Sequence, residues 1–185
     1  MEFLKQFNDG VPFHPALVHL PLGIAMLLPL LALAATVAIR KGWVSRKAWW
    51  GIVGLQVMML GGAFAAYNTG QKEKDLVGGI VDDAPIEAHE EAAEQFFIAT
   101  GALLAVSIGA AMVPARRAAT GAHLLVTGLS ALLLLMGARV GHLGGRLVYV
   151  HNAAQAHLPE NTGAEPAKKG DEGGQGSEGE DEPDD

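Results

Sequence analysis

Residues 15–39 read PALVHLPLGIAMLLPLLALAATVAI, a stretch of 25 residues without a charged side chain. A helix of about 20 apolar residues is long enough to cross the hydrocarbon core of a bilayer. The stretch therefore predicts a transmembrane helix. Because half of the 185 residues are hydrophobic and they come in long blocks, the same reading extends to the rest of the chain.

Three further apolar blocks follow the first. We place the four predicted spans at about residues 15–39, 49–67, 93–113 and 122–142, with the fourth fading beyond Arg139. Trp43, Trp49, Trp50 and Tyr67 flank the second span, as aromatic side chains do at membrane interfaces. Glycines inside the spans allow helices to approach closely. The sequence predicts an all-α integral membrane protein, a four-transmembrane-helix bundle within residues 1–158.

The segment from residue 159 to residue 185 has a different composition. It holds ten acidic residues against Lys168 and Lys169, a net charge of −8, so the remaining body carries +1 of the total of −7. It is rich in Gly, Pro and Glu and has almost no apolar residues. Such a segment cannot bury enough apolar surface to offset its ordering entropy, so we expect a disordered acidic C-terminal tail.

Several chemistries are excluded by composition. The chain has no cysteine, which rules out disulfides, iron–sulfur clusters, thiolate zinc sites and covalent c-type haem. We find no Ser-His-Asp spacing, phosphate loop or dinucleotide fingerprint, so the sequence favours a protein that is not an enzyme. No basic patch with interleaved aromatic residues suggests nucleic acid as a partner. The lipid bilayer is the expected environment.

The basic residues predict the orientation. Six of them lie in the two short loops after the first and third spans: Arg40, Lys41, Arg46, Lys47, Arg116 and Arg117. The positive-inside rule places these loops in the cytoplasm of a bacterial cell, so both termini lie outside the inner membrane. A cleaved signal peptide near Ala32–Ala35 is the alternative, but only Lys5 precedes an apolar block longer than such signals use.

Five of the seven histidines fall at the span ends that this orientation places outside. They are His14 and His19 in the first span, His89 leading into the third, and His142 and His151 where the fourth runs out. The only histidine at the other face is His123. A relay of two bis-histidine haems needs ligands at both faces, so the sequence favours a single outer centre.

Neutral imidazole is the usual axial ligand of b-type haem. We therefore take His19, His89, His142 and His151 as candidate haem ligands, with His14 behind them or as an alternate ligand, and with Arg139 and Arg146 placed to pair with propionates. Gly141, Gly144 and Gly145 would admit a porphyrin face, and Glu90, Glu91 and Glu94 could orient ligand N–H groups. For any one of these histidines, an interfacial helix cap is the plainer interpretation.

The axial pair is left open. His142 and His151 are nine residues apart, so on a continuous helix they point in opposite directions. They could serve one haem only if Gly144-Gly145 interrupted the helix. A pair across helices, such as His19 with His142, is geometrically easier.

Three motifs together resemble a known family. They are the opening His14-Pro15-Ala16-Leu17-Val18-His19-Leu20-Pro21, the short His89-Glu90-Glu91, and the closing stretch from Gly141 to His151. The sequence is similar over residues 11–151 to the bacterial membrane proteins catalogued as domain of unknown function 2231. The resemblance implies four spans and a layout similar to b-type cytochrome bundles, and relatives occur beside cytochrome c-like domains. Asn152 stands where the family pattern has glycine.

The leading hypothesis is a b-type haem protein that transfers electrons at the outer face of the inner membrane. The alternative cofactor is Zn, Cu or Fe, held by His19, His89, His142 and His151 with Glu90. The third hypothesis is a non-redox assembly or anchoring subunit. An acidic tail outside the membrane could steer a basic partner, such as a periplasmic cytochrome c or another redox subunit, toward the bundle.

Overall fold

The computed structural model describes residues 13–157 and contains four long helices within that range. They are α2 (Phe13–Lys41), α3 (Trp49–Val77), α4 (Asp83–Met112) and α5 (Arg116–Tyr149). Two short 3₁₀ helices, η1 (Arg46–Ala48) and η2 (Ala153–His157), complete the order of elements. The expected acidic tail, residues 159–185, lies outside the described residues. All four long helices are long and apolar enough to cross a membrane, as the sequence predicts.

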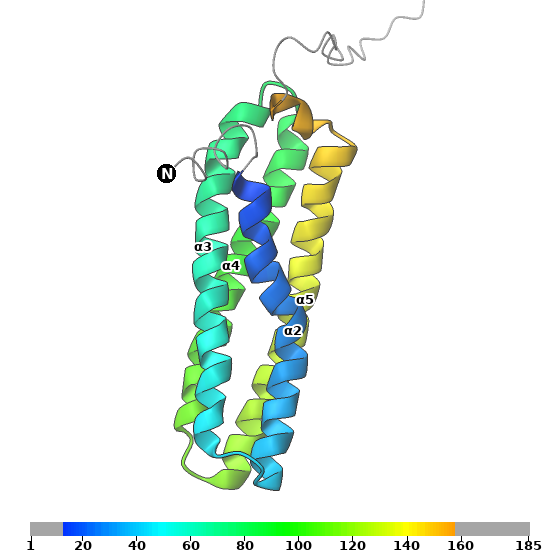
Figure 1. Ribbon diagram of the computed structural model, residues 1–185. Helices are drawn as coiled ribbons and strands as arrows, with labels where there is room; N and C mark the ends of the chain where they lie inside the picture. The colour runs from blue at the N-terminus through cyan, green and yellow to red at the C-terminus, as the bar shows by residue number, and fades with distance from the viewer. Residues whose placement is uncertain (1–12, 158–185) are drawn as a thin grey trace, which may run out of the picture.

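The helices form an antiparallel bundle in which each packs along two neighbours (Figure 1). The order around the bundle is α2, α3, α4, α5 and back to α2, so α2 faces α4 across one diagonal and α3 faces α5 across the other. We call the end where α2 and α4 begin the histidine end. The opposite end, with the loops after α2 and after α4, is the basic-loop end.

Local sequence explains where the first helix stops. Gly42 adopts φ +78°, a conformation that favours glycine, and the N–H of Trp43 donates to the carbonyl of Ala38 at 2.9 Å. This is a Schellman-type end, which satisfies carbonyls that the last turn leaves without an N–H partner. Pro21 and Pro29 lie inside the same helix, as transmembrane helices tolerate.

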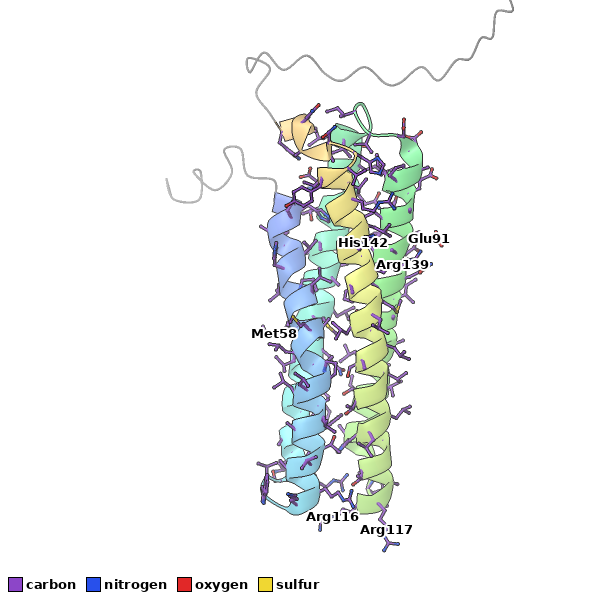
Figure 2. The ribbon with its side chains drawn as sticks, turned by 90° about the vertical axis from the view of Figure 1, so that its right-hand side faces the viewer. Met58, Glu91, Arg116, Arg117, Arg139 and His142 are labelled. Carbon is purple, nitrogen blue, oxygen red and sulfur yellow. The ribbon has the colours of Figure 1, made fainter. Side chains whose placement is uncertain are left out.

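The basic-loop end is tied together by arginine. Arg46 donates to the carbonyls of Pro114, at 2.8 Å, and of Val113. Arg116 donates to the carbonyl of Arg40 at 3.0 Å, so the loops after α2 and after α4 are joined in both directions. Figure 2 shows Arg116 and Arg117 at this end of the bundle.

Two helices extend further than the apolar blocks suggest. The charged segment after Tyr67 stays helical, so α3 runs to Val77. α5 continues through Gly144 and Gly145 to Tyr149, so the helix has no interruption there that would let His142 and His151 face one site. Large apolar side chains such as Leu30 and Leu135, each 67% exposed, face outward, as a lipid environment allows.

The interior follows a two-fold pattern that relates the hairpin α2–α3 to the hairpin α4–α5. Adding 74 to the buried α3 positions Trp49, Ile52, Gln56, Met59, Ala63 and Ala66 gives His123, Val126, Ser130, Leu133, Gly137 and Val140, all buried on α5. Adding 75 to the buried α2 positions Pro21, Ala25, Leu28 and Ala32 gives Phe96, Thr100, Leu103 and Ser107, all buried on α4. The two halves therefore present the same helix faces to one shared core.

Candidate functional site

His14 of α2 and His89 of α4 face each other across the bundle at the histidine end. Their ring centroids are 6.3 Å apart and the ring planes are inclined by 82°. The two residues differ by 75 in number, the same step that relates the other buried positions of these helices. The pair therefore obeys the two-fold relation of the hairpins.

A backbone carbonyl of the next helix accompanies each ring. The Nδ1 atom of His14 lies 2.9 Å from the carbonyl oxygen of Ala66, which is a hydrogen bond with the nitrogen donating, and 3.2 Å from Oγ1 of Thr69. The backbone of Val140 takes the corresponding place beside His89. Ala66 and Val140 differ by 74, so the neighbours of the two rings repeat, whereas Nδ1 of His89 has no hydrogen-bond partner among the described residues.

Glycine makes room for both rings. A Cβ added to Gly70 would lie 3.1 Å from Cε1 of His14, and a Cβ added to Gly144 would lie 3.1 Å from Cε1 of His89. These distances are shorter than ordinary van der Waals contacts, so each imidazole packs against helix backbone where a side chain would crowd it. Gly70 and Gly144 again differ by 74.

One nitrogen on each ring is uncommitted within this arrangement. A donating Nδ1 on His14 leaves Nε2 with a lone pair. Nδ1 of His89 is buried and has no hydrogen-bond partner among residues 13–157. The site thus offers two neutral imidazoles that could each donate a lone pair to a metal.

The other histidines of this end take different positions. His19 is exposed and its Nδ1 bonds its own helix, 2.6 Å from the carbonyl oxygen of Pro15. His142 is exposed on α5, and Figure 2 shows it near Arg139 and Glu91 on the outside of the bundle. His151 follows the end of α5 and is half-buried. The structure therefore brings together His14 and His89, and it does not bring His19 to His142.

The arginine and glutamate residues predicted beside the site also lie on the outside of the bundle. Arg139 donates from Nη1 to Oε1 of Gln95 at 3.1 Å, linking α5 to α4. Arg146 and Glu94 are exposed, and Glu91 accepts from Gln95 at 2.9 Å. Within the described chain, no group of three or more His, Asp or Glu side chains converges as a metal-binding cluster.

Polar contacts brace the two helices beside the pair. Glu90, the residue after His89, accepts from Nε2 of Gln71 at 2.6 Å and pairs with Nζ of Lys74 at 2.7 Å. Further out, Nε2 of His157 lies 2.9 Å from Oε2 of Glu73, which connects η2 to α3. The two contacts of Glu90 link α3 to α4 just outside the imidazoles.

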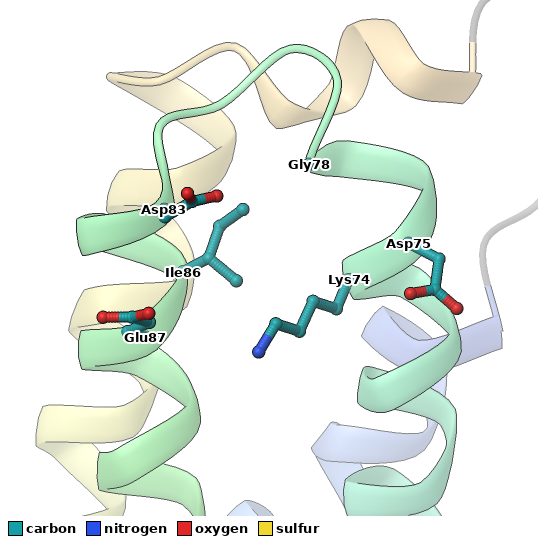
Figure 3. A pocket seen from close by; sticks show the side chains of 6 residues that line it. All are labelled: Lys74, Asp75, Gly78, Asp83, Ile86 and Glu87. Atoms are coloured by element: carbon teal, nitrogen blue, oxygen red, sulfur yellow. The ribbon is translucent and has the colours of Figure 1, made fainter.

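A small apolar cluster covers the histidine end. Val81, Ile86 and Ala153 are buried together, with Val77 and Leu147 packed against them. Beside this cluster, a recess of about 250 Å³ lies between the end of α3 and the start of α4 (Figure 3). The side chain of Lys74 points into it, but Lys74 is already paired with Glu90.

The basic-loop end has a different aromatic pair. The Trp49 indole of α3 stacks on the His123 imidazole of α5, with centroids 3.8 Å apart and planes inclined by 10°. Nε1 of Trp49 donates to the carbonyl of Ser107 at 3.2 Å. Trp49 is fully buried and His123 is 2% exposed. This pair closes the other diagonal of the bundle.

One family model matches most of the chain. Residues 10–157 match the family model described as "Predicted membrane protein (DUF2231)". The chain belongs to this family. The match covers every described residue, so both aromatic pairs of this DUF2231 protein lie in the family's common region. No curated protein and no solved structure matches the chain.

Sequence reasoning missed the pairing of His14 with His89 because a pattern of span ends does not give the rotation of each helix. The two-fold step of 74 to 75 residues was the available signal. It places His14 opposite His89, Gly70 opposite Gly144 and Trp49 opposite His123.

Proposed function

We propose that this DUF2231 protein binds a b-type haem between His14 and His89 and transfers electrons at the histidine end of the bundle. The observation that carries the proposal is the pair itself: two imidazoles on diagonally opposed helices, 6.3 Å apart, each with an uncommitted nitrogen. Bundle cores commonly build cofactor sites from side chains on facing helices.

The separation favours ligands on opposite sides of one metal. Two imidazole nitrogens at about 2.0–2.1 Å from a shared metal would place the ring centroids about 6.4 Å apart if they are opposite, and about 5.2 Å apart at a tetrahedral angle. At the observed 6.3 Å, His14 and His89 would hold one haem iron between them, and the haem would supply one-electron redox chemistry.

The surroundings of the rings fit ligand histidines. A haem ligand usually donates its second ring N–H to a carbonyl, which fixes the tautomer and the ring orientation. The carbonyl of Ala66 provides this for His14. The backbone of Val140 occupies the equivalent place for His89. Gly70 and Gly144 lie on the other diagonal, and each imidazole packs against the backbone of one of them.

Arginine at the same level supplies a counter-charge for propionates. Arg139 precedes Val140 on α5, so it lies at the height of His89, and its side chain reaches the outside of the α4–α5 groove. A guanidinium pairs well with carboxylate oxygens. We therefore assign Arg139 to a propionate, with Arg146, two turns further along α5, as the second candidate.

The redox partner is expected at the same end. The described chain begins at the start of α2 and ends after α5, so both the N-terminal segment and the acidic C-terminal segment attach at the histidine end. A net charge of −8 over residues 159–185 would steer a basic soluble protein such as a cytochrome c toward that face. By the positive-inside rule, the histidine end faces the periplasm.

The alternative is a transition-metal site without porphyrin. Two imidazoles fall short of the three or four protein ligands that Zn sites use, so this function requires ligands beyond the pair. Metal analysis separates the two proposals, since bound Zn, Cu or Fe without a porphyrin absorbance band would favour the second.

The test is the optical spectrum of protein expressed with ample haem and purified in detergent or nanodiscs. We expect a Soret band in the wild type and its loss, by at least about tenfold, in His14→Ala and in His89→Ala, because each removes one axial ligand. His19→Ala and His142→Ala are the matched controls, since both histidines lie at the same end and are exposed. A wild type without a Soret band, or loss in the controls instead, would overturn the assignment.

A further inference from the structure

The charges of the described chain are divided between the two ends of the bundle. No acidic residue occurs in residues 13–72 or in residues 96–157, so every carboxylate side chain that the structure describes lies on the segment between them, toward the histidine end. The basic-loop end instead carries six exposed cationic side chains: Arg40, Lys41, Arg46, Lys47, Arg116 and Arg117. Its formal charge is therefore +6, and no acidic side chain among residues 13–157 lies at this end to balance it.

Hydrogen bonds join the two loops of this end but leave its charge uncompensated. Arg46 donates to carbonyls of the loop after α4, and Arg116 donates to a carbonyl at the end of α2. Nζ of Lys41 lies 4.6 Å from the centroid of the Trp43 ring. Because carbonyls and aromatic rings carry no net charge, these contacts do not neutralise the cations. The two loops therefore form one joined, positively charged surface.

Lys47 and Arg117 are the cations of this surface that are best placed to meet a ligand. They follow Arg46 and Arg116 in sequence, and both side chains are exposed. Figure 2 shows Arg117 pointing away from the bundle at the start of α5. Since Arg46 and Arg116 already hold the loops, Lys47 and Arg117 can bind an anion while the loop contacts stay in place.

Exposed apolar side chains border the cations. Trp43, Trp50 and Met112 lie beside the two loops, and each is more than half exposed. Tryptophan is enriched at the headgroup level of a bilayer. A ligand at this surface therefore meets cations and apolar side chains together. That combination fits a molecule with an anionic headgroup and acyl chains, whereas a soluble anion would use the cations alone.

The chain's own acidic segment does not fit as the occupant. Residues 159–185 follow η2, which lies at the histidine end. α5 has 34 residues, so it separates the two ends by about 51 Å, and it is long and apolar enough to cross the membrane. The anion that meets the basic-loop end therefore comes from outside the chain.

We propose that the basic-loop end binds an anionic phospholipid, with its phosphate held by Lys47 and Arg117 and its acyl chains lying along Trp43 and Met112. Basic segments next to a membrane span are attracted to the anionic lipids of the cytoplasmic leaflet, and basic pockets between spans bind anionic headgroups. The bound lipid would keep the joined loops at the headgroup level. The proposal is independent of what the histidine pair binds.

Quenching of tryptophan fluorescence by brominated lipid tests the proposal. The full chain is placed in phosphatidylcholine nanodiscs that contain a rising share of brominated phosphatidylglycerol, or of brominated phosphatidylcholine as the reference. Trp43 and Trp50 are exposed at this surface and report on it, whereas Trp49 is fully buried. We expect phosphatidylglycerol to bind at least about fivefold more tightly than phosphatidylcholine, because several cations act on one phosphate. Equal quenching by the two lipids would overturn the proposal.

Single-charge variants locate the binding surface. Lys47→Gln and Arg117→Gln should each lower the preference for phosphatidylglycerol by about twofold or more, since each removes one cation near the phosphate. Lys72→Gln is the matched control, because Lys72 is an exposed cation on α3 at the histidine end. All three variants keep every tryptophan. An unchanged preference in Lys47→Gln and Arg117→Gln, or an equal decrease in Lys72→Gln, would contradict the assignment.

A soluble anion distinguishes the lipid from free phosphate. Inorganic phosphate should lower the preference no more than sodium chloride of equal ionic strength, because screening acts on any exposed charge and the acyl chains add contacts that free phosphate lacks. A stronger effect of phosphate than of chloride would mean that the surface binds the free anion, and the lipid proposal would be wrong.

Discussion

The two ends of the bundle use the same architecture for different chemistry. At the histidine end, the two-fold relation is kept: His14 and His89 are equivalent, and so are the glycines against which they pack. At the basic-loop end it is broken, because Trp49 occupies the position equivalent to His123. Only the first end can offer two matched nitrogen ligands. Among the residues that the structure describes, a matched pair of imidazoles therefore occurs at the histidine end and not at the basic-loop end.

Packing at the two ends also differs. The indole and imidazole at the basic-loop end stack 3.8 Å apart and fill the core, whereas the imidazoles at the histidine end are 6.3 Å apart and meet edge to face. Trp49 is one of the largest fully buried side chains, and His14 and His89 are only partly buried. We infer that the basic-loop end contributes stability and that the histidine end contributes the site.

The largest expected effect is the loss of stability in Trp49→Ala. Removing a fully buried indole should cost about 3–5 kcal/mol of unfolding free energy, through lost contacts and a cavity beside His123. Trp50→Ala is the matched control, since Trp50 is adjacent and 52% exposed. Denaturant unfolding in mixed micelles measures both. Equal losses in the two variants would contradict the inference that the burial of Trp49 stabilises the basic-loop end.

A smaller and more local effect is expected from Gly144→Ala. The new Cβ would lie 3.1 Å from Cε1 of His89, so we expect displacement of the ring, a weaker haem site and an overpacking cost of about 1–3 kcal/mol, partly offset by better helix propensity. Gly145→Ala is the control, because nothing lies within 4 Å of its added Cβ. That variant should be stabilised by up to about 1 kcal/mol with an unchanged spectrum. Thermal unfolding and haem titration distinguish the Gly144→Ala variant from the Gly145→Ala variant. If both variants behave alike, the packing of His89 against Gly144 does not set the site.

The smallest expected effect concerns the acidic C-terminal segment. Deleting residues 159–185 should leave stability and spectrum unchanged, because the family match and both aromatic pairs lie before it. Association with a cationic cytochrome c should become slower at low salt, and the difference should vanish as salt screens the charge. Stopped-flow reduction at several salt concentrations measures this. If the deletion changed the association rate equally at all salt concentrations, electrostatic steering by this segment would be excluded.

The sequence predicts the four spans because charge-free blocks of membrane length have few alternatives. It predicts less well where helices leave the apolar blocks. α3 extends to Val77 through a charged segment, and α5 continues through Gly144 and Gly145, since packing against neighbours outweighs the low helix propensity of glycine.

The sequence predicts at which end of the bundle the candidate site lies, but it does not predict which two histidines form a pair there. Span ends show that five histidines share one end of the bundle, whereas the rotation of each helix decides which of them point inward. His14 and His19 are five residues apart, so they lie on opposite sides of α2, and only His14 faces His89. A search for a common repeat step between the two halves would have selected His14 and His89.

The repeat has a consequence for how the protein is made. Each hairpin contains its own positively charged loop, Arg40 to Lys47 in the first and Arg116 with Arg117 in the second, and each is joined at the far end by a segment poor in free positive charge. Positive loops act locally on the insertion of the helices beside them. Each half therefore carries its own positively charged loop, and the positive-inside rule predicts the same orientation for both halves independently.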